Sequence, residues 1–135
     1  MTSRVEYKGE LRCSSLHIGS NNEIITDAPT DNHGKGEAFS PTDLVATALA
    51  GCMLTVMGIK ARQSDIDIVG TEAEVTKIMS SDPRRISEVR VLVKMPDKNY
   101  DQRTRILLEK TARTCPVAYS LSEKLTQTIR FQWFD

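Results

Sequence analysis

The sequence has no excess of charge of either sign and few aromatic residues. Its 18 Lys plus Arg residues equal its 18 Asp plus Glu residues, and no basic run is interleaved with aromatic residues. Because such a run is typical of nucleic-acid-binding surfaces, we expect no nucleic acid partner. The sequence also contains no internal repeat and no low-complexity segment, which argues against a repeat architecture.

Paired metal ligands are absent as well. The cysteines and histidines form no CxxC or HxxxH pair; they are Cys13, Cys52, Cys115, His17 and His33. Zinc sites normally show such pairs, so we expect no metal site, and no cofactor is expected.

No targeting segment is recognisable. The first residues, MTSRVEYKGELR, carry charges where a signal peptide would be apolar, and the one long apolar run is rich in Ala, Thr and Gly. We therefore expect a cytoplasmic protein with reduced thiols and no membrane partner. A chain of 135 residues is expected to form one domain, 1–135, large enough to fold without disulfides.

The apolar run predicts a central helix from Ser40 to Arg62. Ser40 suits the N-cap position, Pro41 the first helical position, and Asp43 can bond back to the amide of the cap. No charged residue occurs between Asp43 and Lys60. A helix that is apolar on every side is buried all round. One small sheet and a short helix pair can hardly cover it, so we expect a homodimer in which two central helices bury one another.

Alternating segments surround this helix. Before it, the pattern predicts strands on either side of a Lys8-Gly9 turn and a third strand at 23–27. After it, we expect an extended segment at 65–79 and a half-buried antiparallel strand at 86–95. A helix is predicted at 101–111, a second helix beginning at Pro116, and a last strand at 128–133. The order favours an α+β fold, with antiparallel sheets around a long buried helix and a second helix pair.

Two cysteines are candidates for chemistry. Cys115 precedes the helix that begins at Pro116, where the positive end of the helix dipole is expected to lower the pKa of the thiol. Cys52 lies in the middle of the central helix, so a neighbouring cation would have to lower its pKa. The alternative is that both are small core residues, and Cys13, on an alternating strand, fits that description best.

Two motifs together resemble a known family. The segment SPTDLVATALAGC, followed much later by TCPVAYSL, resembles the OsmC/Ohr family of osmotically inducible and organic hydroperoxide resistance proteins, and the loop HGKGEAFSP falls in the expected place. The resemblance implies an α+β fold and an intertwined homodimer with both active sites at the interface. It also implies thiol-dependent reduction of organic hydroperoxides in oxidative stress defence, with an external dithiol as the reductant.

The resemblance also implies roles for individual residues. Cys52 is similar to the peroxidatic cysteine and Cys115 to the resolving cysteine of the family. In the Ohr branch an arginine stabilises the thiolate and is held by a glutamate one position after the helix-opening proline. Here that position is Thr42, with Asp43 next to it. Arg12 is the best candidate for the arginine, and Glu37 is a candidate for its missing partner.

Three functions remain open at this stage. The first is a peroxidase, in which apolar residues near Cys52 would favour bulky hydroperoxides; they are Leu49, Met53, Val56 and Phe39. The second is a non-catalytic dimer that binds a small apolar ligand at its interface. The third is a purely structural dimer with inert thiols.

Overall fold

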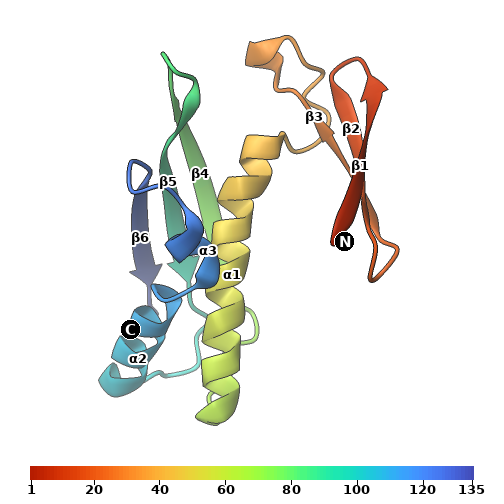
Figure 1. Cartoon of the computed structure of the whole chain (residues 1–135). Coiled ribbons are helices and arrows are strands. Elements are labelled where there is room, and N and C mark those ends of the chain that lie inside the picture. Colours follow the sequence, from red (N-terminus) through yellow and green to blue (C-terminus); the bar gives the residue numbers. More distant parts are fainter. The chain divides into compact units, whose positions relative to one another are not determined.

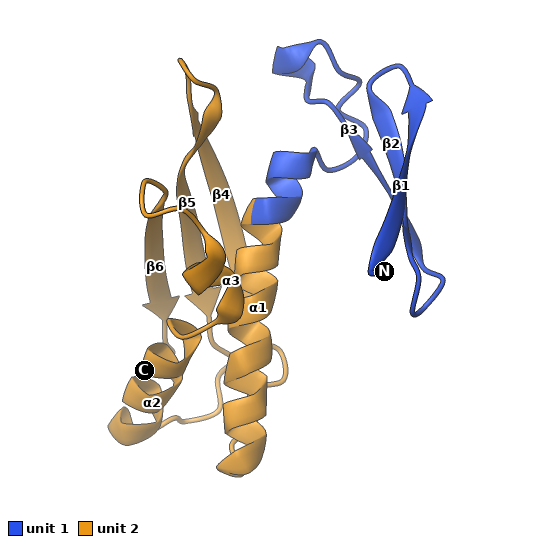
Figure 2. Cartoon of the chain, in the orientation of Figure 1, with its two compact units in different colours: residues 1–45 blue, residues 46–135 orange.

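The computed structural model describes all 135 residues, which form two compact units, residues 1–45 and 46–135 (Figure 2). The boundary falls inside the central helix. The expectation of a single domain over 1–135 stays a prediction. In chain order the elements are β1 (Ser3–Gly9), β2 (Arg12–His17), β3 (Glu23–Asp27), a short 3-10 turn (Thr30–Asn32), α1 (Pro41–Gln63), β4 (Glu72–Ser80), β5 (Arg85–Lys94), α2 (Gln102–Ala112), α3 (Pro116–Ser120) and β6 (Thr126–Gln132).

The first unit contains an antiparallel sheet of three consecutive strands, β1-β2-β3, as predicted (Figure 1). Its first turn lies further along the chain than the Lys8-Gly9 pair indicated. The strand β1 continues through Gly9, which has a φ of 88° beside a bulge, and the turn is made by Glu10 and Leu11 with φ values of 52° and 62°. Because glycine adopts positive φ freely, Gly9 accommodates the bulge without ending the strand.

The second unit contains a mixed sheet of order β4-β5-β6 (Figure 1). The strands β4 and β5 are antiparallel, as predicted, but β6 is parallel to β5. The expectation of wholly antiparallel sheets is therefore wrong for this edge. The helices α2 and α3 connect β5 to β6, and a helical crossover returns the chain in the same direction. The alternation of apolar and polar residues predicts which side chains share a face of a strand. It does not predict whether the neighbouring strand is parallel or antiparallel.

The extended segment predicted for 65–69 is instead a loop, and strand β4 begins only at Glu72. Three hydrogen bonds from Tyr100 and Lys98 help to hold this loop: Tyr100 Oη donates to the carbonyl oxygen of Asp67 at 2.6 Å, and Lys98 Nζ donates to Asp67 Oδ2 and to the carbonyl oxygen of Val69, both at 2.8 Å. Its backbone groups therefore pair with side chains, which a short alternating pattern does not reveal.

The helix α1 buries one face against the mixed sheet of the second unit. The core residues of α1 and the sheet are Ala46, Leu49, Ala50, Met53, Met57, Val89, Val91 and Val93. The opposite face is exposed in this chain and consists of Ala48, Gly51, Thr55, Ile59 and Arg62. The prediction of burial on every side is thus wrong for the single chain, because the sheet covers only one side of the helix.

By length and composition alone, α1 qualifies as a possible membrane span, with 23 residues and a mean hydropathy of 1.8. The Ala, Thr and Gly content of this helix is therefore not sufficient to exclude a membrane span. Helices that form the core of soluble proteins can have the same length and composition. Its face of buried residues against a sheet is the arrangement of such a core helix.

Candidate functional site

The start of α1 is held by a reciprocal pair of hydrogen bonds. The Oγ of Ser40 accepts the N–H of Asp43 at 3.1 Å, and the Oδ2 of Asp43 accepts the N–H of Ser40 at 3.0 Å. Together with Pro41 at the first helical position, this confirms the predicted capping box. Asp43 therefore serves to begin the helix that carries Cys52.

Cys115 is the N-cap residue of α3, with Pro116 directly after it, as predicted. Its Sγ accepts the N–H of Ala118 at 3.3 Å, and its side chain is wholly buried. Burial raises the pKa of the Cys115 thiol, and the hydrogen bond to Cys52 adds to the rise, while the N–H of Ala118 opposes it. The expectation of a lowered pKa at Cys115 is wrong, because desolvation outweighs the amides at the start of a five-residue helix.

Cys52 and Cys115 lie side by side although 62 residues separate them in the sequence. Cys52 interacts with Cys115 and contributes to the raised pKa of the Cys115 thiol, and no disulfide is present. Cys52 is partly exposed, whereas Cys115 is wholly buried. The pair is therefore asymmetric, since only Cys52 is in part accessible to solvent. Cys13 belongs to the other unit, where it is half-buried between Tyr7 and Thr26.

In the first unit, Arg12 is held by a carboxylate that the sequence did not single out. Arg12 Nε lies 2.6 Å from Asp27 Oδ1, and Arg12 Nη2 lies 2.8 Å from Asp27 Oδ2. The side chain of Asp27 is 1% exposed, and that of Arg12 is 30% exposed. The hydrogen bonds from Arg12 hold the pKa of Asp27 below its ordinary value, and the hydrogen bonds to Asp27 raise the pKa of Arg12.

Glu37, the predicted partner of Arg12, lies further from the guanidinium than Asp27 does. Its Oε1 lies 3.7 Å from Arg12 Nη2, and its side chain is 66% exposed. The backbone N–H of Glu37 donates to Asp27 Oδ2 at 3.1 Å. Asp27 therefore binds both the guanidinium of Arg12 and the backbone of Glu37. The prediction correctly placed Glu37 beside Arg12, but Asp27 is the residue that fixes the guanidinium.

A signal for Asp27 was present in the sequence. The register of β2 with β3 pairs Arg12 with Asp27 and Leu16 with Glu23, which corresponds to folding the chain about Gly19 and Ser20. The segment Gly19-Ser20-Asn21-Asn22 is a strong turn signal, and folding about its first two residues would have placed Arg12 and Asp27 opposite one another.

The loop between β3 and α1 depends on two glycines. The N–H of Gly34 donates to the carbonyl oxygen of Pro29 at 2.9 Å, and that of Gly36 to the carbonyl oxygen of Ala28 at 3.2 Å. A Cβ atom at Gly34 would lie 1.7 Å from the carbonyl oxygen of Ala28. Only glycine permits this approach, which explains the glycines in HGKGEAF and fixes the path of the chain to Glu37.

The predicted site residues thus form two groups, one in each unit. Arg12, Glu37 and Asp43 belong to residues 1–45, and Cys52 and Cys115 to residues 46–135. The 135 described residues contain no group of three or more His, Cys, Asp or Glu side chains able to hold a metal ion. The second unit also has an open apolar groove of about 400 Å³, lined by Thr55, Gly58, Ile59, Ala61, Arg62, Ile66, Asp67, Ile68 and Val69.

Comparison with known proteins places these features in a family context. Residues 34–130 match the family model described as OsmC-like protein. No curated protein matches the chain. A candidate osmotic stress induced and detoxification response protein of Psychrobacter arcticus is 56% identical and superposes with a TM-score of 0.94, over 98% of this chain and 96% of that one.

More distant structures share the fold. An organic hydroperoxide resistance protein OsmC of Legionella pneumophila is 15% identical with a TM-score of 0.74, over 98% of both chains. The organic hydroperoxide resistance protein OhrB of Bacillus subtilis is 17% identical with a TM-score of 0.66, again over 98% of both chains. These similarities confirm the α+β fold expected from the sequence.

Proposed function

The chain belongs to the OsmC-like family, and from that premise we propose that it is a thiol-dependent peroxidase that reduces organic hydroperoxides in the cytoplasm as part of a stress response. The observation that carries the proposal is the adjacent pair of Cys52 and Cys115, one partly exposed and the other buried. The structurally similar proteins of Legionella pneumophila and Bacillus subtilis are organic hydroperoxide resistance proteins, which supports the same chemistry.

In the first step, the Cys52 thiolate attacks the terminal oxygen of the hydroperoxide. The O–O bond breaks, the alkoxide takes up a proton and leaves as an alcohol, and Cys52 becomes a sulfenic acid. Cys52 is assigned this role because it is the thiol of the pair that is exposed to an incoming oxidant. Burial raises the pKa of the Cys115 thiol, which favours its protonated form.

In the second step, the sulfur of Cys115 attacks the sulfur of the Cys52 sulfenic acid. The S–O bond breaks, hydroxide leaves with the proton of Cys115 as water, and a Cys52–Cys115 disulfide forms. The two thiols are already close enough to interact, which supports this step. An external dithiol then reduces the disulfide and is itself oxidised.

Arg12 is proposed to support the Cys52 thiolate, with Asp27 as the residue that positions it. A bidentate carboxylate fixes the plane of the guanidinium and leaves its remaining N–H groups to face another partner. In this proposal Asp27 takes the part of the glutamate that is replaced here by Thr42. Glu37, 3.7 Å from Arg12, adds a second negative charge.

We further propose that the protein acts as a homodimer. The exposed face of α1 carries small residues, and a Cβ at Gly51 would meet no atom within 4 Å, so a second helix can approach closely. In the first unit, the β1-β2-β3 sheet exposes a row of apolar side chains, with Val5 62% and Ile24 51% exposed on one face. Exposed apolar surfaces of this kind mark association sites.

A second candidate is a dimer that binds a small apolar ligand without catalysis. The groove of about 400 Å³ in the second unit favours it, because its volume is in the range of small-molecule sites and isoleucines line it. No cysteine lines the groove, so this function would leave the thiol pair unused.

Titration of free thiols separates the two functions. The chain has three cysteines, and one equivalent of cumene hydroperoxide should remove two thiols per chain, leaving Cys13. A ligand-binding protein with inert thiols would keep all three. Loss of a single thiol, or loss of two in the Cys115→Ser variant, would contradict the proposed disulfide.

A further inference from the structure

Cys115 has two structural functions that compete once the thiols are oxidised. Its thiol lies beside that of Cys52, with which it interacts, and its sulfur also accepts the N–H of Ala118 as the cap of α3. Disulfide formation draws the sulfur towards Cys52 and leaves it a weaker acceptor than a thiol. Because a helix start depends on partners for its free N–H groups, oxidation should weaken the start of α3.

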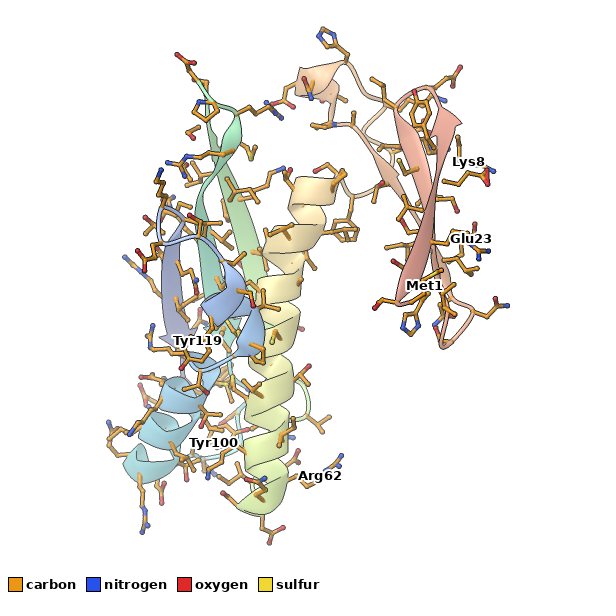
Figure 3. All side chains as sticks on the ribbon, viewed as in Figure 1. Met1, Lys8, Glu23, Arg62, Tyr100 and Tyr119 are labelled. Atoms are coloured by element: carbon orange, nitrogen blue, oxygen red, sulfur yellow. The ribbon has the colours of Figure 1, made fainter.

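The helix α3 is short, and apart from its hydrogen bonds it is held by Val117 and Ala118, which are partly buried against the core. It has five residues, none of them buried, and Tyr119 (Figure 3) is 73% exposed. Within the segment, the N–H of Tyr119 donates to the carbonyl oxygen of Cys115 at 3.3 Å, and Ser120 Oγ donates to that of Pro116 at 2.8 Å. From outside it, Gln127 Nε2 of β6 donates to the carbonyl oxygen of Ala118 at 3.0 Å. Ala118 is thus held at both its polar groups, by Cys115 and by Gln127.

Reduction of the Cys52–Cys115 disulfide requires that the external dithiol reach one of its two sulfur atoms. A thiolate attacks along the S–S axis, and the reaction is faster when the departing thiol has the lower pKa. Attack on Cys52 would expel Cys115, a poor leaving group because burial raises the pKa of its thiol. Attack on Cys115 makes Cys52 the first leaving group and leaves the departure of Cys115 to the intramolecular second step, but the side chain of Cys115 is wholly buried.

We propose that residues 115–121 act as a flap that opens in the oxidised protein and admits the dithiol reductant to the Sγ of Cys115, with Gln127 as the latch. This inference rests on the proposed function. One thiolate of the reductant bonds to Cys115, the S–S bond breaks, and Cys52 leaves as a thiolate. The second thiolate of the reductant then attacks its own bonded sulfur, expelling Cys115 as a thiolate that takes up a proton. The reductant ends as a disulfide.

The wild-type protein provides the first test. Hydrogen exchange is measured on the reduced protein and on protein treated with one equivalent of cumene hydroperoxide, with the state of the thiols checked by mass spectrometry. We expect faster exchange of the Ala118 and Tyr119 amides after oxidation, while amides of β5 remain unchanged. If no Cys52–Cys115 disulfide forms, the proposed function fails. If the disulfide forms and the α3 amides exchange as before, the flap is wrong and the proposed function stands.

The second test removes the latch. Gln127→Leu deletes the donor to Ala118 and keeps a side chain of similar size, and Gln132→Leu makes the same change on the same strand without touching α3. Reduction of the preformed disulfide by dithiothreitol is timed in both. We expect about a fivefold faster reduction in Gln127→Leu, the factor that corresponds to one ordinary hydrogen bond, and no change in Gln132→Leu. An unchanged or slower reduction in a folded Gln127→Leu protein would overturn the role of Gln127 as the latch.

Discussion

Arg12 donates two hydrogen bonds to Asp27, from Nε to Oδ1 at 2.6 Å and from Nη2 to Oδ2 at 2.8 Å. The carboxylate is 1% exposed, so the pair joins β2 to β3 at a site shielded from water. In the OsmC-like chain, this places the carboxylate that holds the arginine on a strand of the first sheet rather than on the central helix, where Thr42 stands.

The first prediction tests that carboxylate. Asp27→Asn keeps the shape of the side chain but removes its charge, and a charge-assisted hydrogen bond contributes about 1.5–3 kcal/mol. If Arg12 supports the thiolate, the rate constant for hydroperoxide reduction should fall about tenfold or more, as measured by stopped-flow. Glu37→Gln is the control and should change the rate less than about twofold, because that side chain is 66% exposed. Equal losses in the two variants would remove the special role of Asp27.

The second prediction is that the contribution of Asp27 to the free energy of unfolding depends on pH, and the same Asp27→Asn variant tests it. The pKa of Asp27 is lowered in the folded protein, so its contribution is fully present above the ordinary pKa of about 3.9 and is lost as the pH falls through the lower folded value. The difference in urea midpoint between wild type and Asp27→Asn should therefore be constant from pH 7 to about 5 and shrink below about pH 4. A difference that grows on acidification would contradict this.

The third prediction separates the two cysteines. Cys52→Ser should abolish hydroperoxide consumption, because a hydroxyl group is not a nucleophile of thiolate quality. Cys115→Ser should complete one turnover and stop with a sulfenic acid at Cys52. Mass spectrometry after one equivalent of oxidant should find one added oxygen on the peptide that contains Cys52. The added oxygen on Cys115 in Cys52→Ser, with full consumption of oxidant, would reverse the roles.

The fourth prediction concerns substrate preference. Among the residues expected near Cys52, Leu49 and Met53 are buried in the core, and Val56 is partly buried beside it. An alkyl chain that enters such surroundings should gain about 0.8 kcal/mol per buried methylene, about fourfold in rate. Second-order rate constants should rise along a series of linear alkyl hydroperoxides and exceed that of hydrogen peroxide. A flat series would exclude an apolar substrate site.

The fifth prediction tests the homodimer. A Cβ at Gly51 meets no atom within 4 Å in the single chain, so Gly51→Leu should leave the fold of one chain intact. On the exposed face of α1 the leucine would prevent close approach of a second helix, and we expect dissociation at micromolar concentration by sedimentation velocity. Gln63→Leu, which adds the same side chain at the exposed end of the helix, is the control. A wild-type protein that sediments as a folded monomer would make the dimer wrong.

The sequence by itself determined those features that depend on neighbouring residues. Ser40 and Asp43 cap α1, Cys115 caps α3 before Pro116, and the alternation from Ile86 to Met95 predicted β5. Capping bonds span three residues and strand faces alternate with period two, so local chemistry is sufficient to predict them. The spacing of Cys52 and Cys115 does not predict that they act together. That expectation came from the family resemblance.

The tertiary structure decided what depends on distant segments. The parallel direction of β6 follows from the crossover through α2 and α3, and the exposed face of α1 follows from a sheet that covers only one side. The raised pKa of Cys115 follows from burial, which outweighs the local helix start that suggested the opposite. The pairing of Asp27 with Arg12 follows from the β2–β3 register, because an ion pair between strands is set by how the strands align and not by the residues next to each partner in the chain.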